Sequence, residues 1–407
     1  MKIEIQINNS TSPGTSFVSW APSPCRIRMT DPTGATGATV PIQLRSVSAA
    51  TAGAVVFRAG ATGAFADPLT LQVPANGNSV SFFTAGRFRR PSSSIGDVKI
   101  EARAGTTLVG SAALMVRIRK NANALSTAER DRFVAAFARL NNQGTGRFTD
   151  FRDMHTNVSS PQAHGAPGFL PWHRAYLLDL ERELQAIDPS IALPYWRFDQ
   201  ASPNIFTLEF LGVSDNLGTV RFGPNNPLQF WRTDGVQGIN RRPFFSTASA
   251  PPGLRNETDT LALGTTYAAF RTMEGNPHGT AHTSFGGSIS SIGTAARDPL
   301  FFLLHCNVDR LWAKWQRRNG RFNPALAASY DTRPTNPIGH RLPDTMWPWN
   351  GITGGSRPPT APGGPMAASA LVSAPGPRPI VQSSLDYQGS VNAASRLGFD
   401  YDDVEFA

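Results

Sequence analysis

The histidines of this 407-residue chain are few and clustered. Seven occur, none of them in the first 150 residues, and six form two groups of three. Eight residues lie in each gap of the first group, whereas the second group has an i, i+4 pair and a distant third member. Neutral imidazole is a favoured ligand for copper, zinc and related ions. The candidate metal ligands are therefore His155, His164 and His173 in one set, and His278, His282 and His305 in the other.

The helical spacing around two of these histidines places them on apolar faces. After Pro171, a favourable residue for a first helical turn, steps of four and three residues join His173 to Leu177, Leu180, Leu184 and Ile187. After Pro299 the same steps join His305 to Phe301, Val308, Trp312 and Trp315. A buried imidazole without a polar partner is costly. Several histidines aimed at one interior therefore favour metal binding over isolated hydrogen-bonded core positions.

The second group also bears on the identity of the metal. A zinc hydrolase commonly carries HExxH, with a carboxylate beside the first histidine, but the segment from His278 to His282 reads HGTAH. No cysteine or carboxylate ligand accompanies either group. Two all-histidine sets suit a redox pair of copper ions better than structural zinc.

Longer segments around the histidines resemble the type 3 copper family of tyrosinases, catechol oxidases and haemocyanins. FLPWHRAYLLDLERELQ (residues 169–185) is similar to the family's helix at the first copper, and DPLFFLLHCNVDRLW (298–312) to its motif at the second. EGNPHGTAH (274–282), LPYWRFD and MWPWN extend the likeness over about residues 120–350. The resemblance implies a four-helix bundle around a dicopper centre.

The resemblance assigns roles to the histidines. It implies that the first set holds copper A and the second set holds copper B, with Leu304 in place of the first histidine of the usual HH pair. His340 matches no ligand, so we expect it to be structural and an alanine there to leave both coppers in place. Many members link a cysteine to the second copper A histidine; Gln162 stands at that position, so no thioether is expected. Cys306 is expected to be a small buried packing residue.

The resemblance also indicates residues around the substrate. Glu274 matches the catalytic glutamate that holds a water near the coppers and helps to deprotonate a phenol. Gly279 stands where many true tyrosinases have asparagine, Thr283 follows the second copper B histidine, and Ile292 aligns with a bulky phenylalanine gate. The loss of the asparagine favours oxidation of o-diphenols to o-quinones, with weaker hydroxylation of monophenols. An o-aminophenol oxidase and a haemocyanin-like dioxygen carrier remain the alternatives.

The pattern of apolar, polar and turn-forming residues changes near residue 119. Residues 1–118 alternate apolar and polar positions between turn residues, which predicts an all-β, sandwich-like domain. Residues 119–350 are expected to form a mainly α catalytic domain, which a capping box of Ser126 and Glu129 opens. Residues 351–379 read as a Gly/Pro-rich linker or strap, and 380–407 as a tail that docks on the catalytic domain.

Composition excludes several partners. The net charge of +9 comes mostly from arginines spread along the chain, so no nucleic-acid module is indicated. No apolar run approaches the length of about 20 residues needed to cross a membrane, and the N-terminus lacks the features of a secretory signal, which favours a cytoplasmic location. The expected partners are a phenolic small molecule and dioxygen; the sequence is also compatible with a homo-oligomer.

Overall fold

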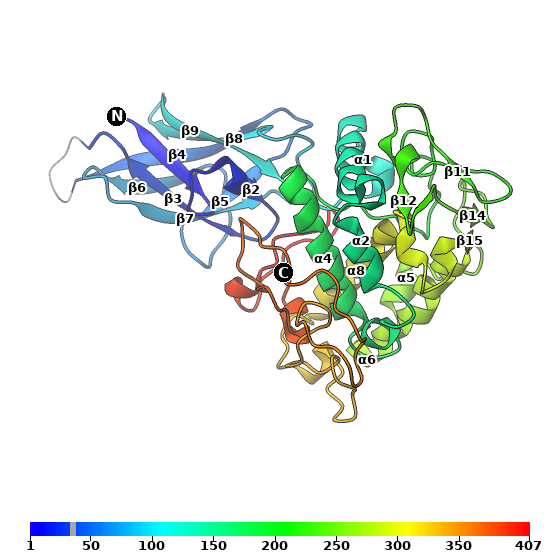
Figure 1. The fold of residues 1–407 in the computed structure, drawn as a ribbon. Coiled ribbons are helices and arrows are strands. Elements are labelled where there is room, and N and C mark those ends of the chain that lie inside the picture. The colour runs from blue at the N-terminus through cyan, green and yellow to red at the C-terminus, as the bar shows by residue number, and fades with distance from the viewer. Residues whose placement is uncertain (33–37) are drawn as a thin grey trace. The chain divides into compact units, whose positions relative to one another are not determined.

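The computed structural model describes residues 1–32 and 38–407 (Figure 1). The chain forms two compact units. The first, here called the β unit, comprises Met1–Ile118, Ala370–Val372 and Gly398–Phe406. The second, the helical unit, comprises Arg119–Ser369, Ser373–Leu397 and Ala407.

Two sheets make up most of the β unit. One has the strand order β1-β3-β7-β5, and the other has the order β2-β9-β8-β4-β6. Neighbouring strands are antiparallel except β2 and β9, which are parallel. The strands are β1 (Ile3–Ile7), β2 (Phe17–Val18), β3 (Ser23–Met29), β4 (Thr39–Ser48), β5 (Val55–Arg58), β6 (Leu69–Pro74), β7 (Val80–Gly86), β8 (Val98–Ala104) and β9 (Thr107–Val116).

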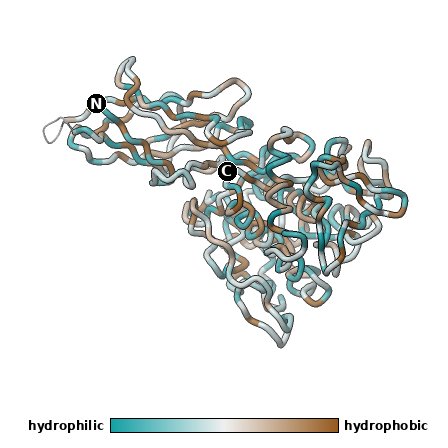
Figure 2. Tube along the Cα trace, turned by 45° about the horizontal axis from the view of Figure 1, so that its top comes forward, coloured by the Kyte–Doolittle hydropathy of each residue, from teal (hydrophilic) through white to brown (hydrophobic). Residues whose placement is uncertain are grey.

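The alternation in the sequence corresponds to the pleat of these strands. In β1 the three isoleucines are buried and the residues between them are partly exposed. Apolar side chains of both sheets join one hydrophobic cluster, for which Ile27 in β3 and Ile100 in β8 are examples. Figure 2 shows hydrophobic and hydrophilic positions along these strands. Successive side chains of a strand point to opposite faces, so each strand contributes every second residue to this core.

The C-terminal segment Gly398–Phe406 belongs to the β unit. The indole N–H of Trp20 donates to the carbonyl of Tyr401 at 2.7 Å, and the backbone N–H of Ala21 donates to the buried carboxylate of Asp400 at 3.1 Å. These bonds satisfy polar groups that would otherwise be buried without partners. Our expectation that the whole tail docks on the catalytic domain is therefore wrong for these residues.

Four helices form the centre of the helical unit: α1 (Thr127–Asn141), α2 (Phe148–Met154), α4 (Phe169–Ile187) and α8 (Leu300–Asn319). The predicted capping box of Ser126 and Glu129 opens α1. Helices α4 and α8 pack against each other, and most of their residues are buried (Figure 1). Within the described ranges of the chain, no helix combines the length and the apolar character that crossing a bilayer requires.

Shorter elements and long irregular segments surround these helices, so the unit is helical mainly at its centre. The short helices are α3 (Ser160–Ala163), α5 (Glu257–Leu261), α6 (Tyr267–Phe270) and α7 (Thr280–Thr283), and Gly275–Gly279 forms a π-helical turn before α7. Paired two- or three-residue strands are β10 (Val213–Ser214) with β11 (Val220–Arg221), β12 (Arg232–Thr233) with β13 (Val236–Gln237), and β14 (Arg241–Pro243) with β15 (Phe285–Gly287).

The Gly/Pro-rich segment after residue 350 has no regular secondary structure, and side chains of the helical unit hold its backbone. Arg147 donates to the carbonyl of Gly363 at 2.7 Å. Arg182 donates to the carbonyl of Ala367 at 2.9 Å, and the N–H of Ala367 donates to Asp179 at 2.8 Å. Because a segment without a helix or sheet must satisfy its backbone groups in another way, these contacts make it a strap over α2 and α4.

A buried cluster of charges joins the two central helices. Arg119 contacts Glu181 of α4 at 2.8 Å and Asp309 of α8 at 3.2 Å. Arg174 of α4 contacts the other oxygen of Asp309 at 2.6 Å. All four side chains are buried almost completely. The helices that carry His173 and His305 are thus connected by ion pairs as well as by apolar packing.

Candidate metal centre

The structure gathers the six predicted ligands into two compact triads. His155 follows α2, His164 follows α3, and His173 lies in α4. His278 lies in the π-helical turn, His282 in α7 and His305 in α8. Within each triad the three candidate ligand nitrogens lie within 4.8 Å of one another. Such a spacing suits one metal ion in each triad.

Backbone carbonyls orient four of the six imidazoles. A carbonyl oxygen can only accept a hydrogen bond, so the Nδ1 atom that contacts it carries the proton and the Nε2 lone pair remains available. This arrangement fixes the tautomer that ligates a metal through Nε2. The contacts join Nδ1 of His155 to the carbonyl of Ile292 (3.1 Å), His173 to Phe169 (2.9 Å), His278 to Glu274 (2.7 Å) and His282 to Ile289 (2.7 Å).

The Nε2 atoms themselves show that the triads fit metal ions. Nε2 of His305 lies 3.3 Å from Nε2 of His278 and 3.1 Å from that of His282. His278 and His282 carry their ring proton on Nδ1, so the lone pair on Nε2 of each neutral ring is directed toward His305. Nε2 of His173 is buried and has no hydrogen-bond partner among the described residues. A buried acceptor without a donor is costly, and a cation bound between the lone pairs removes that cost.

Burial keeps these imidazoles neutral. Desolvation is the largest cause in each case; it lowers the pKa of His155 to about 3, that of His164 to about 2 and that of His282 to about 4. The pKa values of the other three ligand histidines, His173, His278 and His305, are lowered well below the usual value for the same reason. Metal binding requires the neutral ring, so protons do not compete for these sites near pH 7.

Aromatic side chains surround the triads. The rings of His173 and His305 are stacked with centroids 4.1 Å apart. Phe301 lies one turn before His305, with ring centroids 4.2 Å apart, and Phe169 lies 4.8 Å from both His173 and His278. Both phenylalanines are completely buried. This apolar shell packs closely against the rings of His173, His278 and His305.

Glu274 contacts the segments of both triads. Its carboxylate accepts a hydrogen bond of 2.7 Å from the N–H of Gly165, the residue after His164, and pairs with Arg271 at 3.3 Å. Its carbonyl is the acceptor for His278. Burial, the largest cause, raises the pKa of this carboxyl above its ordinary value. The sequence did not predict the contact with Gly165, because Glu274 and Gly165 lie 109 positions apart in the chain and no local pattern connects them.

The other predicted pocket residues differ in their surroundings. Gly279 has helical backbone angles, and a Cβ atom there would meet only the carbonyl oxygen of Glu274, at 3.4 Å. The exposed hydroxyl of Thr283 donates to the carbonyl of Gly279 at 2.9 Å. The side chain of Ile292 is 43% exposed, while its carbonyl holds His155. The sequence pointed to the side chain of Ile292 and missed this backbone role.

Gln162 and Cys306 have the environments of structural residues. Gln162 is buried, and its amide lies 3.4 Å from the carbonyls of Ile338 and Ser356. Cys306 forms no disulfide within the described part of the chain; its thiol is fully buried, and its Sγ lies 3.6 Å from the carbonyl of Leu193. A glutamine side chain has no sulfur, so position 162 cannot form a thioether.

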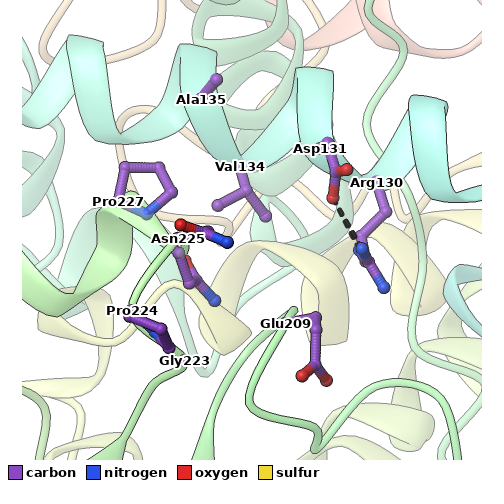
Figure 3. A pocket seen from close by; sticks show the side chains of 10 residues that line it. Arg130, Asp131, Val134, Ala135, Glu209, Gly223, Pro224, Asn225 and Pro227 are labelled. Atoms are coloured by element: carbon purple, nitrogen blue, oxygen red, sulfur yellow. Dashed lines mark hydrogen bonds and ion pairs between the residues drawn. The ribbon is translucent and has the colours of Figure 1, made fainter.

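A cavity of about 510 Å³ lies beside α1, apart from the histidines (Figure 3). Arg130 and Asp131, which form an ion pair, stand on one side of it, and Glu209 and Asn225 stand on loops opposite. No histidine lines this cavity. It therefore has no part in the metal centre.

Comparisons with known proteins agree with this geometry. Residues 145–318 match the family model described as the common central domain of tyrosinase. A tyrosinase of Streptomyces glaucescens is 34% identical over 263 residues, which cover 57% of this chain and 92% of that protein. The chain belongs to the tyrosinase family. A second tyrosinase, of Streptomyces antibioticus, is 33% identical over 268 residues, which cover 58% of this chain and 94% of the relative.

Membership of this family makes the chain a copper-dependent oxidoreductase of phenols, with two copper ions on the two histidine triads. The chain is also similar to haemocyanin units of Enteroctopus dofleini, with 30% identity over 215 residues that cover 49% of this chain and 7% of that protein. Among solved structures, the chain is similar to a polyphenol oxidase of Thermothelomyces thermophila, with a TM-score of 0.48 and 18% sequence identity. The matched region covers 70% of this chain and 88% of the polyphenol oxidase chain. The residues that match the family model all lie within the helical unit.

Proposed function

We propose that this family member oxidises o-diphenols to o-quinones and hydroxylates monophenols more slowly. Each molecule of dioxygen accepts four electrons from two diphenols and leaves as two waters, while two quinones are released. The observation that carries the preference is the surroundings of Glu274. Its carboxylate is already bonded to Gly165 and Arg271, and Gly279 has no side chain that could help to hold a water beside it.

Different residues of the chain have different roles in this reaction. Copper bound by the six imidazoles supplies the electron exchange between dioxygen and the phenol. The carbonyls that bond to Nδ1 keep the imidazoles oriented, and Phe169 and Phe301 pack against the ligand rings. Glu274 accepts the phenolic proton through a water. The half-exposed Ile292, together with Gly279 and Thr283, borders the space for the aromatic ring of the substrate.

A monophenol depends on proton removal more than a catechol does. It must lose its hydroxyl proton before it can ligate copper, and a base works well only when the water between it and the substrate is oriented. The hydroxyl of Thr283 is directed toward the carbonyl of Gly279, so it supplies no donor that replaces an asparagine amide. Slow deprotonation therefore limits the monophenol reaction, while catechol oxidation proceeds.

Gly279→Asn is expected to raise the ratio of monophenol to catechol activity by about tenfold, because an amide would orient the water beside Glu274. The helical backbone at Gly279 suits any L residue, and a Cβ atom there would make only an ordinary contact of 3.4 Å with the carbonyl oxygen of Glu274. The measurement is the ratio of steady-state kcat/KM values for a matched monophenol and catechol. Gly279→Ala is the control, since it adds a Cβ atom without an amide. An unchanged ratio in Gly279→Asn, or an equal rise in Gly279→Ala, would refute the role assigned to the missing amide.

The proposed reaction is tested with copper-loaded protein. We expect two copper ions per chain by metal analysis, and oxygen uptake that is faster with a catechol than with the matching monophenol or o-aminophenol. A faster rate with the o-aminophenol would instead identify an o-aminophenol oxidase. Reversible uptake of dioxygen without consumption of any phenol would identify a carrier, the alternative that the similarity to haemocyanin units favours. Binding of a single metal ion would contradict the dicopper assignment.

We also propose domain limits that separate the β-strand part of the chain from its helical part. Residues 1–118 form a sandwich-like domain without metal ligands, which is supported by two sheets that share one hydrophobic cluster. Residues 119–350 form the catalytic domain, a four-helix bundle around the coppers, which is supported by the origin of His173 and His305 on the packed helices α4 and α8.

A further inference from the structure

His164 differs from the other ligands in how it is held. It follows the four-residue helix α3 and has an extended backbone, whereas His173 and His305 lie within long helices. Its Nδ1 atom is buried and makes no hydrogen bond among the described residues, in contrast to the four imidazoles that donate to carbonyls. The position of this ring therefore depends on the backbone that carries it.

A single buried side chain joins the two ends of that backbone loop. Nε2 of His340 lies 2.8 Å from the carbonyl of Pro161, three residues before His164. The N–H of Gly168, four residues after His164, donates to Nδ1 of His340 at 3.0 Å. A carbonyl can only accept and an N–H can only donate, so both contacts require the neutral tautomer with its proton on Nε2.

The surroundings of His340 support this clamp. The residue is completely buried, and its carbonyl accepts a hydrogen bond of 2.8 Å from Tyr330. The ring of Tyr330 lies 4.7 Å from that of Tyr267, whose hydroxyl donates to the carbonyl of Pro167 within the same loop. The absence of a side chain at Gly168 is also necessary, because a Cβ atom there would lie 2.4 Å from Nδ1 of His340.

We propose that His340 is a positioning residue for copper A: by bonding to Pro161 and Gly168 it closes the loop that presents His164 to the metal. Both of its ring nitrogens contact backbone groups, which supports our expectation that His340 is not a copper ligand. From the sequence we expected His340→Ala to leave both coppers in place. This proposal changes that expectation, because the loop that carries His164 would lose both hydrogen bonds. His155 and His173 have their own carbonyl contacts, so the effect is confined to one ligand of one copper.

The test is the release of copper from the loaded full-length protein to a competing chelator. His340→Phe fills the space without either hydrogen bond, and we expect one of its two coppers to leave about tenfold faster than in the parent, while the other leaves at the parent rate. His340→Gln, which offers one donor and one acceptor, is expected to restore slow release at least in part. Gly168→Ala disturbs the contact between Gly168 and His340 by adding a Cβ atom, and it is expected to release the same copper faster.

Asn226→Leu is the matched control. Asn226 is buried and holds a different loop of the helical unit through bonds to the carbonyls of Leu208 and Phe210. Among the described residues, none of its side-chain hydrogen bonds reaches a segment that carries a ligand histidine. We expect it to lower the unfolding temperature without faster release of copper. Parent-like release from both His340→Phe and Gly168→Ala, or equal acceleration in Asn226→Leu, would overturn the proposal. Release is measured without a phenol, so the outcome does not depend on which substrate the enzyme oxidises.

Discussion

Replacing His173 or His305 with alanine is expected to remove one copper ion and essentially all oxidase activity. Each imidazole is one of the three candidate ligands of its triad, and each is held on a long, largely buried helix. Both coppers take part in the electron exchange, so loss of either ion stops turnover. Metal analysis after dialysis and oxygen uptake with a catechol measure the two effects.

Leu177→Ala is the control for these ligand variants. Leu177 lies one turn after His173 on the same buried face of α4 and is completely buried. Its truncation leaves a cavity and is expected to cost about 2–5 kcal/mol of stability, yet it removes no ligand. We expect this variant to retain two coppers per chain. Retention of both coppers by His173→Ala and His305→Ala would show that the ligand assignment is wrong.

Replacing Asp309 with leucine is expected to lower the free energy of unfolding of the helical unit by about 3–5 kcal/mol, because removal of one partner from a buried ion pair leaves an uncompensated charge. Asp309 accepts hydrogen bonds from both Arg119 and Arg174, and all three side chains are almost completely buried. Denaturant unfolding followed by tryptophan fluorescence is the measurement, because several buried tryptophans belong to this unit.

Asp150→Asn is the matched control at the surface. Asp150 of α2 pairs with Arg147, the residue directly before this helix, but both side chains remain partly exposed to solvent. Exposed ion pairs contribute about 1 kcal/mol or less, so we expect a small change. A loss from Asp309→Leu no larger than that from Asp150→Asn would mean that the buried cluster does not stabilise the packing of α4 on α8.

The sequence predicted the candidate ligands and the regular elements because these predictions depend on local patterns. Helical steps of four and three residues place His173 and His305 on the apolar faces of their helices, and these are the faces that the fold buries. The capping box at Ser126 and the alternation in β1 likewise act within a few residues. Glutamine at position 162 excludes the thioether through residue type alone, because its side chain has no sulfur.

Only the tertiary structure decided which distant groups hold these ligands. The carbonyl of Ile292 meets His155 across 137 residues, the carboxylate of Glu274 meets Gly165 across 109, and His340 meets Gly168 across 172. The placement of Gly398–Phe406 in the β unit is of the same kind. Such contacts depend on the paths of irregular loops, where any residue offers the same carbonyl and N–H groups. Residue type and periodicity therefore identify the ligands, whereas the folding of the loops around them determines their tautomers and positions.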